Sequence, residues 1–374
     1  MKKKRILLIH NDRTLLKLYR EKLEDSGFDV EATRELDQAS REIEKRTPDL
    51  ILLDLVFLRG KPVNFITSVR KQTLTAKTPI LVLPTSLVEM VAAAMHSGAT
   101  SAIPESETPL ASTIRTVLAT LGLPDIDAKR FDALSKASNL WVSSVLSGAV
   151  ENINLMRQCL PGISAQPPEL PALRELWTLV HAFADKTVLM PYKPLAQFAG
   201  ALSLLIRDLD TMPEQINPSI LRTVCQALDF LASIADIEQL QRLTDASSGN
   251  VLVVDDEQSA RQFIMSALEY AGIKSDSAAS PASALDRLNG PKPDVIFLDV
   301  GLPEMNGFDL CTKIRTVEAY QKTPIVFITG MATFVNKAKA NLSGGNDFVG
   351  KPFNLLELGV KALTWLFRGQ LEPA

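Results

Sequence analysis

The sequence predicts an α/β fold at each end of the chain and a helical bundle between them. Two observations support the α/β ends: the ends repeat one another, and both copies hold short, continuous apolar runs. The middle lacks such runs and has helical periodicity instead. With 374 residues, at about 100–200 residues per domain, the chain is long enough for two to four domains. We expect three, over residues 1–122, 123–247 and 248–374.

The internal repeat emerges when the sequence is compared with itself at a shift of 245 positions. The aligned pairs include Leu7 and Leu252, Asp54 and Asp299, Arg70 and Arg315, and, after one inserted residue, Gly98 and Gly344. Because the segment between the copies is different, the repeat indicates duplication of a domain rather than a solenoid.

The second copy alternates strands with helices. Apolar runs predict strands over 251–254, 295–298, 325–328 and 348–349. Residues 258–271 have a helical pattern that Gly272 ends. Continuous rather than alternating apolar runs are typical of a parallel sheet that is covered on both faces.

Polar residues directly follow these runs: Asp255, Asp256, Asp299, Thr329 and Lys351. In open α/β sheets ligands bind beyond the carboxyl ends of the strands, so we expect these side chains to converge at one edge. Crowded carboxylates repel one another unless a cation lies among them, and oxygen ligands suit Mg²⁺. With a Lys and a Thr beside them, the carboxylates could stabilise a phosphoryl group in transfer and the resulting acyl phosphate. A single polar residue after a strand could be explained as a helix or loop cap. Five such residues at the ends of these strands are much harder to explain in that way.

The second copy resembles the receiver (CheY-like) domain of two-component response regulators, which has a flavodoxin-like (βα)5 fold. The motifs that carry the resemblance are Val-Leu-Val-Val-Asp255-Asp256-Glu257, Phe297-Leu-Asp299-Val-Gly-Leu-Pro303-Glu-Met-Asn-Gly307, Ile328-Thr329-Gly330 and Phe348-Val-Gly-Lys351-Pro352. Four motifs in the family's order and spacing are far more specific than any one of them.

The resemblance implies that Asp299 is the phosphoacceptor and also a ligand of the Mg²⁺ cofactor. It implies Asp256 as a direct metal ligand, Asp255 as a ligand through water, and the Gly301 carbonyl as a further ligand.

The resemblance also assigns the residues around the phosphate. Lys351 would pair with the phosphate, Thr329 would bind it and move on activation, and Phe348 matches the family's switch aromatic. The Lys351–Pro352 bond is a candidate cis peptide, since only an X-Pro bond adopts that form at small cost.

The first copy keeps Asp54 in the place of Asp299 but has lost the groups around it. His10 and Asn11 replace the acidic pair, Pro84 replaces the threonine, and Glu105 replaces the lysine. A neutral Asn is a weaker Mg²⁺ ligand, and a glutamate puts negative charge where a phosphate needs a positive one. We favour a degenerate receiver, or pseudo-receiver, used for partner binding or dimerisation. The alternative keeps Asp54 as a weak, vestigial phosphorylation site.

The middle segment has four apolar-periodic stretches separated by prolines, near 130–160, 169–190, 194–210 and 218–243. This pattern predicts a four-helix bundle. His181 is the one histidine of the segment, and the helical period places it on the flank of the apolar stripe. A lone flank histidine is most often a surface residue.

Trp177–His181 and the following Leu195–Leu202 segment resemble the histidine phosphotransfer domain, a four-helix bundle with its phosphohistidine on the second helix. The family has Lys and Gly three and four residues after that histidine, where this chain has Ala184 and Asp185. Asp185 lies one turn on and would repel a phosphoryl group. We favour a phosphotransfer-like fold with an inactive His181, and keep His181 as a phosphohistidine as the alternative.

The composition limits the kinds of partner and the cellular compartment that we expect for this protein. The chain has 40 Lys+Arg and 43 Asp+Glu, a net charge of −3, which argues against binding of nucleic acid or anionic membrane through overall charge. The three cysteines are far apart and odd in number, so we expect no disulfide or metal clip and a reducing, cytoplasmic location. The apolar run at 6–9 is too short for a signal peptide or a membrane span.

These observations predict phosphorelay signal transduction. Asp299 would accept a phosphoryl group from a histidine kinase or phosphotransfer protein, and output would pass through contacts with an unknown downstream protein. The chain is also expected to be able to form a homodimer with a second copy of itself. Apart from Mg²⁺-dependent self-phosphorylation and dephosphorylation we expect no enzyme activity. The alternatives are an intramolecular relay through His181 and a scaffold that works without phosphorylation.

Overall fold

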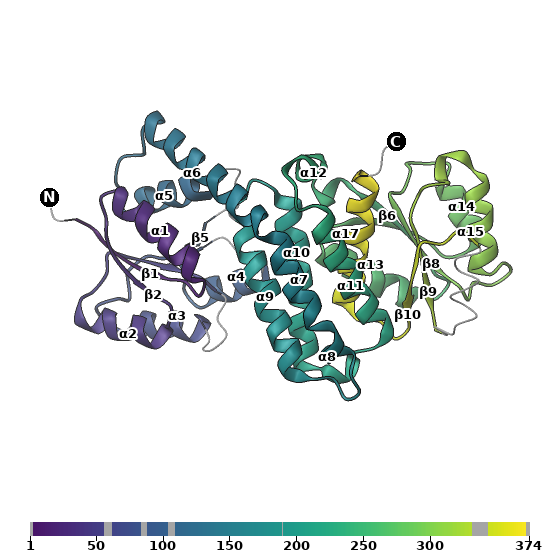
Figure 1. Cartoon of the computed structure of the whole chain (residues 1–374), viewed down its shortest axis with the longest axis horizontal. Coiled ribbons are helices and arrows are strands. Elements are labelled where there is room, and N and C mark those ends of the chain that lie inside the picture. The colour runs from purple at the N-terminus through teal and green to yellow at the C-terminus, as the bar shows by residue number, and fades with distance from the viewer. Residues whose placement is uncertain are drawn as a thin grey trace. The chain divides into compact units, whose positions relative to one another are not determined.

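The computed structural model of the chain describes residues 3–55, 62–83, 88–103, 109–188, 190–330 and 343–371. The chain forms two compact units, residues 1–147 with 182–196, and residues 148–181 with 197–374. Each unit contains one five-stranded parallel sheet (Figure 1). Pro84 and Glu105, which the sequence places at the first copy's site, lie outside the described residues.

The sheet of the first unit has the strand order β2-β1-β3-β4-β5. Its strands are β1 Arg5–Ile9, β2 Asp29–Thr33, β3 Leu50–Leu53, β4 Ile80–Val82 and β5 Ser101–Ala102. The helices are α1 Arg13–Asp25, α2 Leu36–Lys45, α3 Pro62–Lys71, α4 Val88–His96, α5 Pro109–Thr120 and α6 Ala128–Ser147. Every residue of β1, β3 and β4 is buried, as a sheet covered on both faces requires.

The sheet of the second unit has the equivalent order, β10-β9-β8-β6-β7. Its strands are β6 Asn250–Val254, β7 Lys274–Ala278, β8 Val295–Asp299, β9 Ile325–Thr329 and β10 Asp347–Gly350. The helices described around this sheet are α13 Gln258–Tyr270, α14 Pro281–Arg287, α15 Gly307–Thr316 and α17 Leu355–Leu371. The four strands predicted from apolar runs are all present. Strand β7 was not predicted, because its sequence Lys-Ser-Asp-Ser-Ala has no apolar run and lies at the sheet edge.

A matched pair of arginines shows that the two copies share local structure as well as topology. Arg70 donates from Nε to the Gly98 carbonyl at 2.7 Å, and Arg315 donates from Nε to the Gly344 carbonyl at 2.8 Å. Both glycines have positive φ, 104° and 87°. This backbone conformation brings each carbonyl to the arginine and is strained for residues with a Cβ. The duplication predicted from sequence therefore extends to this hydrogen-bond device.

Helices occupy the chain between the two sheets. After α6 they are α7 Ala149–Gln158, α8 Leu160–Ser164, α9 Leu170–Val188, α10 Lys193–Thr211, α11 Pro218–Ser233 and α12 Ile237–Arg242, with short 3-10 turns η1 Pro213–Gln215 and η2 Ala246–Ser248. The first predicted stretch, 130–160, is not one helix, since it breaks at Gly148 between α6 and α7. The other three stretches correspond to α9, α10 and α11.

The last helix described, α17, is buried along most of its length, so it has packing partners on more than one face. It contacts α13, which follows β6 of the second sheet, and α11 of the helical segment, as Figure 1 shows. Phe367 of α17 lies 6.2 Å, between ring centroids, from Phe230 of α11, and Phe230 lies 4.8 Å from Phe198 of α10. This aromatic cluster joins the helical segment and the last helix of the α/β domain in one core, within the second unit.

Across the described part of the chain, no helix is both long enough and apolar enough to cross a membrane.

Candidate functional site

The carboxyl ends of β6, β8 and the edge strand β10 bring two carboxylates and a lysine together. Asp299 ends β8, Asp255 follows β6, and Lys351 follows β10. The Lys351 Nζ lies 2.9 Å from Asp299 Oδ1 and 2.9 Å from Asp255 Oδ2. The expected convergence of these three side chains is therefore observed. The Lys351–Pro352 peptide bond is cis, as predicted.

Burial and pairing set the charges of this cluster. Burial raises the pKa of Asp255, because desolvation outweighs its hydrogen bonds from Lys351 and from the Glu257 amide. Burial acts to lower the pKa of Lys351, but hydrogen bonds to Asp255 and Asp299 outweigh it and the pKa is raised. Lys351 is therefore held as a cation beside Asp299, where it can neutralise negative charge that develops there.

The other predicted residues lie around this cluster. Thr329 ends β9 and is buried, one strand from Asp299. The Gly301 amide donates a 2.7 Å hydrogen bond to Asp299 Oδ2. Phe348 is buried in β10, while Asp256 is exposed after β6.

The donor set is compatible with Mg²⁺. Asp255 and Asp299 supply carboxylate oxygens, the hard ligands that Mg²⁺ takes, and Mg²⁺ sites commonly use one or two carboxylates with water and phosphate oxygens. Among the described residues, no group of three or more His, Cys, Asp or Glu side chains is arranged to hold a metal ion. The direct ligation predicted for Asp256 therefore stays a prediction.

The first copy places a histidine where the second has Asp255. The His10 Nδ1 lies 3.4 Å from Asp54 Oδ2, and it accepts the Asp12 backbone amide at 3.1 Å. In the second copy Asp255 accepts the corresponding amide, that of Glu257, at 2.9 Å. The imidazole has therefore taken over the carboxylate's backbone contact, but it adds no oxygen ligand for a metal.

Two further aspartates surround Asp54 in the first unit. Asp12 caps α1, its Oδ1 accepting the amides of Thr14 and Leu15. Desolvation, followed by the negative charges of Asp54 and Asp12, raises the pKa of Asp185 well above its ordinary value. Asp185 therefore favours its neutral form, so no carboxylate of this pair replaces the charged Asp255 of the second copy.

His181 is buried, with 6% of its surface exposed, which contradicts the expected flank position. Its ring stacks on Trp177 at 5.1 Å, and Ser203 Oγ lies 3.3 Å from its Nδ1. Trp177 precedes it by four residues, so both rings lie on one helix face. The buried arc of α9 is wider than the aliphatic stripe from which the flank position was predicted.

Sequence reasoning missed a polar contact between α11 and the receiver. Arg222 of α11 donates from Nε to Asp347 Oδ1 at 2.9 Å, and Ser219 Oγ accepts the Gly350 amide at 3.3 Å. Asp347 and Gly350 are the end residues of β10, next to Phe348 and Lys351. No motif marks these contacts, since the helical segment has no counterpart in the repeat.

Comparison with known proteins identifies the domain that both sheets belong to. The response regulator receiver domain family matches residues 6–109 and 251–362. The transcriptional regulatory protein TrcR of Mycobacterium tuberculosis is 33% identical over 136 residues, which is 36% of this chain and 52% of that protein. The protein RcaC of Microchaete diplosiphon is 30% identical over 238 residues, covering 60% of this chain and 34% of that protein. The chain spans about half the length of the first curated relatives that it matches.

Solved structures also match single receiver domains. The receiver domain of the Francisella response regulator 1452 is 30% identical, covers 32% of this chain and 98% of that one, and gives a TM-score of 0.31. The chemotaxis response regulator CheY4 of Vibrio cholerae is 34% identical, with 29% and 92% of the two chains covered and a TM-score of 0.29. The two ranges matched by the family cover both sheets except for the first residues, Arg5 and Asn250, and together they span more than half of the chain. The chain therefore belongs to the response regulator receiver domain family and carries that domain twice.

Proposed function

We propose that the C-terminal receiver accepts a phosphoryl group on Asp299 from a phosphohistidine of a histidine kinase or phosphotransfer protein. One observation carries the proposal: the Lys351 ammonium lies 2.9 Å from the carboxylates of both Asp299 and Asp255, at the carboxyl edge of the parallel sheet. A strand-end carboxylate paired with a fixed cation suits phosphoryl transfer, because the cation offsets charge on the transferring oxygens.

In the proposed step a carboxylate oxygen of Asp299 attacks the phosphorus of the donor phosphohistidine. The P–N bond breaks as the O–P bond forms, and the imidazole leaves with the electron pair and takes a proton from solvent. No redox partner is needed. Lys351 stays protonated throughout and moves its hydrogen bond from the carboxylate to a phosphoryl oxygen.

Asp255, Asp256, Asp299 and the Gly301 carbonyl are the residues that would hold Mg²⁺. When bound, the ion would neutralise phosphoryl oxygens and the crowded carboxylates. Asp255 supports this role because it is buried beside Lys351 and faces Asp299. Gly301 fixes Asp299 through its own amide, which leaves its carbonyl available on the same loop.

The signal would pass to other proteins through the surface near Thr329 and Phe348. Both residues are on strands adjacent to the site, β9 and β10, so a change at Asp299 reaches them through one strand or through Lys351. A downstream protein or a second copy of this chain is the proposed receiver of that signal.

The first receiver is proposed as a pseudo-receiver that contributes a binding surface rather than chemistry. His10 in place of a carboxylate supports this role over the vestigial phosphosite, because it supplies no oxygen ligand for a metal beside Asp54. For the phosphotransfer-like segment we propose a structural role, because the 6% exposure of His181 leaves little access for a phosphodonor.

The test is incubation of the full chain with acetyl phosphate and Mg²⁺, followed by peptide mass spectrometry. We expect one phosphoryl group, on Asp299, which is lost in Asp299→Ala and retained in the matched variant Asp54→Ala. An unmodified Asp299, together with no binding of beryllofluoride, would overturn the proposal. Label on His181 would favour the relay instead.

A further inference from the structure

Helix α11 presents a polar face to the C-terminal receiver. Ser219, Arg222, Thr223 and Gln226 follow the i, i+3, i+4, i+7 spacing that defines one side of a helix. Each of the four contacts β10 or α17: Ser219 and Thr223 donate to Glu357, Arg222 pairs with Asp347, and Gln226 accepts from Lys361. All these residues belong to the second compact unit.

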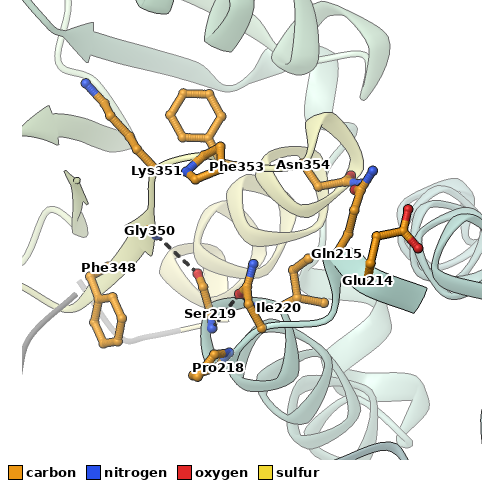
Figure 2. Close-up of a pocket in the computed structure, with 12 residues that line it drawn as sticks. Glu214, Gln215, Pro218, Ser219, Ile220, Phe348, Gly350, Lys351, Phe353 and Asn354 are labelled. Atoms are coloured by element: carbon orange, nitrogen blue, oxygen red, sulfur yellow. Dashed lines mark hydrogen bonds between the residues drawn. The ribbon is translucent and has the colours of Figure 1, made fainter. Parts of the chain in front are cut away.

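Arg222 and Ser219 contact the strand residues that precede Lys351. The Arg222 guanidinium lies over the Phe348 ring, with 4.9 Å from Cζ to the ring centroid, and at the same time pairs with Asp347. Ser219 Oγ accepts the amide of Gly350, the residue before Lys351, as Figure 2 shows. The first two turns of α11 thus hold the end of the strand that delivers the lysine to Asp299.

The two ends of α11 are attached differently. Near its C-terminal end Phe230 packs in the aromatic cluster with Phe198 and Phe367, an apolar contact that is costly to open. At its N-terminal end Ile220 and Val224 are buried as well, but the contacts to β10 are hydrogen bonds and an ion pair, and the Arg222 side chain is 43% exposed. These contacts to β10 can be exchanged for water at smaller net cost. The polar contacts of these turns to β10 can therefore open while the apolar contacts of the helix stay in place.

There is room for such a movement. A pocket of about 610 Å³ lies between the start of α11 and the segment from Phe348 to Asn354 (Figure 2). Since a water molecule occupies about 30 Å³ in the liquid, this space can accept a shifted side chain or loop without a clash. At the edge of the pocket, Asn354 donates hydrogen bonds to Asp208 and Gln215. These bonds fix the loop that leads from β10 into α17.

We propose that the N-terminal half of α11 is a latch that holds the C-terminal receiver in the arrangement where Lys351 bonds the unmodified Asp299 carboxylate. A phosphoryl group on Asp299 would draw the Lys351 ammonium to its own oxygens. That shift displaces Gly350 and Phe348, to which Ser219 and Arg222 bind. The two arrangements therefore compete, and Arg222 and Ser219 are positioning residues for the phosphorylation site, although they lie outside the matched receiver range. This inference rests on the proposed function of Asp299.

Competition of this kind is reciprocal. If release of the latch favours the phosphate analogue, the analogue must favour release of the latch by the same factor, because the two equilibria share one coupling free energy. Couplings within proteins commonly amount to about 5- to 150-fold. We therefore expect both effects to be at least about fivefold.

The experiment measures the affinity of the full chain for beryllofluoride with Mg²⁺ by calorimetry, in wild type, Arg222→Ala, Arg222→Lys and Arg157→Ala. Arg157 of α7 pairs with Asp229 on α11 at 2.6 Å, an ion pair between two helices of the helical segment, so it is the matched control. We expect Arg222→Ala to bind about fivefold more tightly or better. Arg222→Lys should fall between it and wild type, and Arg157→Ala should equal wild type.

Hydrogen exchange supplies the reciprocal readout. In wild type, beryllofluoride should speed amide exchange over residues 219–224 and leave residues 227–233, around Phe230, unchanged. Equal or weaker binding by folded Arg222→Ala, or unchanged exchange over 219–224, would overturn the latch and leave phosphorylation of Asp299 intact. Failure of wild type to bind beryllofluoride, with Asp299 unmodified by acetyl phosphate, would overturn the proposed function and the latch together.

Discussion

Ser219 of α11 donates a hydrogen bond of 2.6 Å to Glu357 of α17, and the two residues are 138 positions apart in the sequence. Thr223, one turn further along α11, donates to the same oxygen at 3.1 Å. Glu357 is fully buried, so a carboxyl group inside the second unit depends on hydroxyls from another segment of the chain. This contact gives the stability of the unit a distinct dependence on pH.

Glu357→Gln should make the free energy of unfolding less sensitive to rising pH. Burial raises the pKa of Glu357 despite its hydrogen bonds from Ser219 and Thr223. A group with a raised pKa contributes stability below its unfolded pKa, and that contribution is lost as pH rises through the folded pKa. Wild type should therefore lose stability relative to the variant, by at most about 1.4 kcal/mol per pH unit. Urea titrations from pH 4 to 8 measure this, and a pH-independent difference would contradict it.

Asp347→Ala should be among the most destabilising changes in the second unit. The Lys361 ammonium, 2.8 Å from Asp347 Oδ2, is fully buried, and without that carboxylate its remaining described bond is to Gln226 at 3.3 Å. Leaving a buried charge without its partner costs about 3–5 kcal/mol. Chemical denaturation of Asp347→Ala should show this loss, and adding Lys361→Met should restore part of it. A double variant no more stable than the single one would argue against an ionic origin.

Asp347 should also make the unit sensitive to acid. Burial alone would raise the pKa of Asp347, but Lys361 and Arg222 outweigh it and the pKa is lowered. Stability from a lowered pKa is present above the unfolded value and is lost as pH falls through the folded one. Below about pH 4, wild type should therefore converge in stability with Asp347→Asn. Unfolding curves at pH 2–4 test this, and a constant gap between the two proteins would speak against it.

Gly307→Ala should disturb the phosphorylation site directly. A Cβ at this position would overlap the Asp299 carbonyl oxygen and lie 3.0 Å from the Val300 Cα, both backbone atoms that cannot move alone. Overpacking of this kind costs about 1–3 kcal/mol, and here it would shift the phosphoacceptor strand. Weaker beryllofluoride binding and a lower Tm are expected.

The control for this change is Gly369→Ala, in α17. A Cβ there meets no atom within 4 Å, and alanine favours a helix interior over glycine by about 0.5–1 kcal/mol. This variant should keep wild-type affinity and be equally or slightly more stable. Wild-type binding by Gly307→Ala would show that the strand end tolerates displacement.

The paired arginines allow the two copies to be compared in one protein. Gly98→Ala and Gly344→Ala each place a Cβ 3.0 Å from an arginine Cγ, at a backbone with positive φ. Strain at such a position costs about 1–3 kcal/mol. Each variant should lower the stability of its own unit only, which calorimetry can resolve as separate transitions. A large effect in one copy and none in the other would mean that the device has diverged.

The strands and the central residues of the site could be predicted from the sequence, because both depend on short apolar runs and on the residues that directly follow them. β6, β8 and β9 are continuous apolar runs, and a parallel sheet gathers the residues at their ends at one edge. Asp255, Asp299 and Lys351 therefore meet as expected. β7 was missed because an edge strand needs no apolar run.

The remaining errors concern contacts between distant segments. The burial of His181 depends on Trp177 and on Ser203 of the next helix, which the period of a single helix does not reveal. The pairing of Arg222 with Asp347 joins positions 125 residues apart and has no motif. Polar partners of this kind are set by tertiary packing, so they appear only when the elements have been placed.

Helix α17 packs against α13 on one side and α11 on the other, and this has an evolutionary consequence. A receiver that can be cut out and joined to other proteins needs a last helix whose outer side tolerates water. In the second copy that side is committed to Phe230 and the hydroxyls of α11, so a substitution must satisfy two neighbours at once. We expect the second copy and the helices before it to be inherited together as one unit, and not to be exchanged separately between proteins.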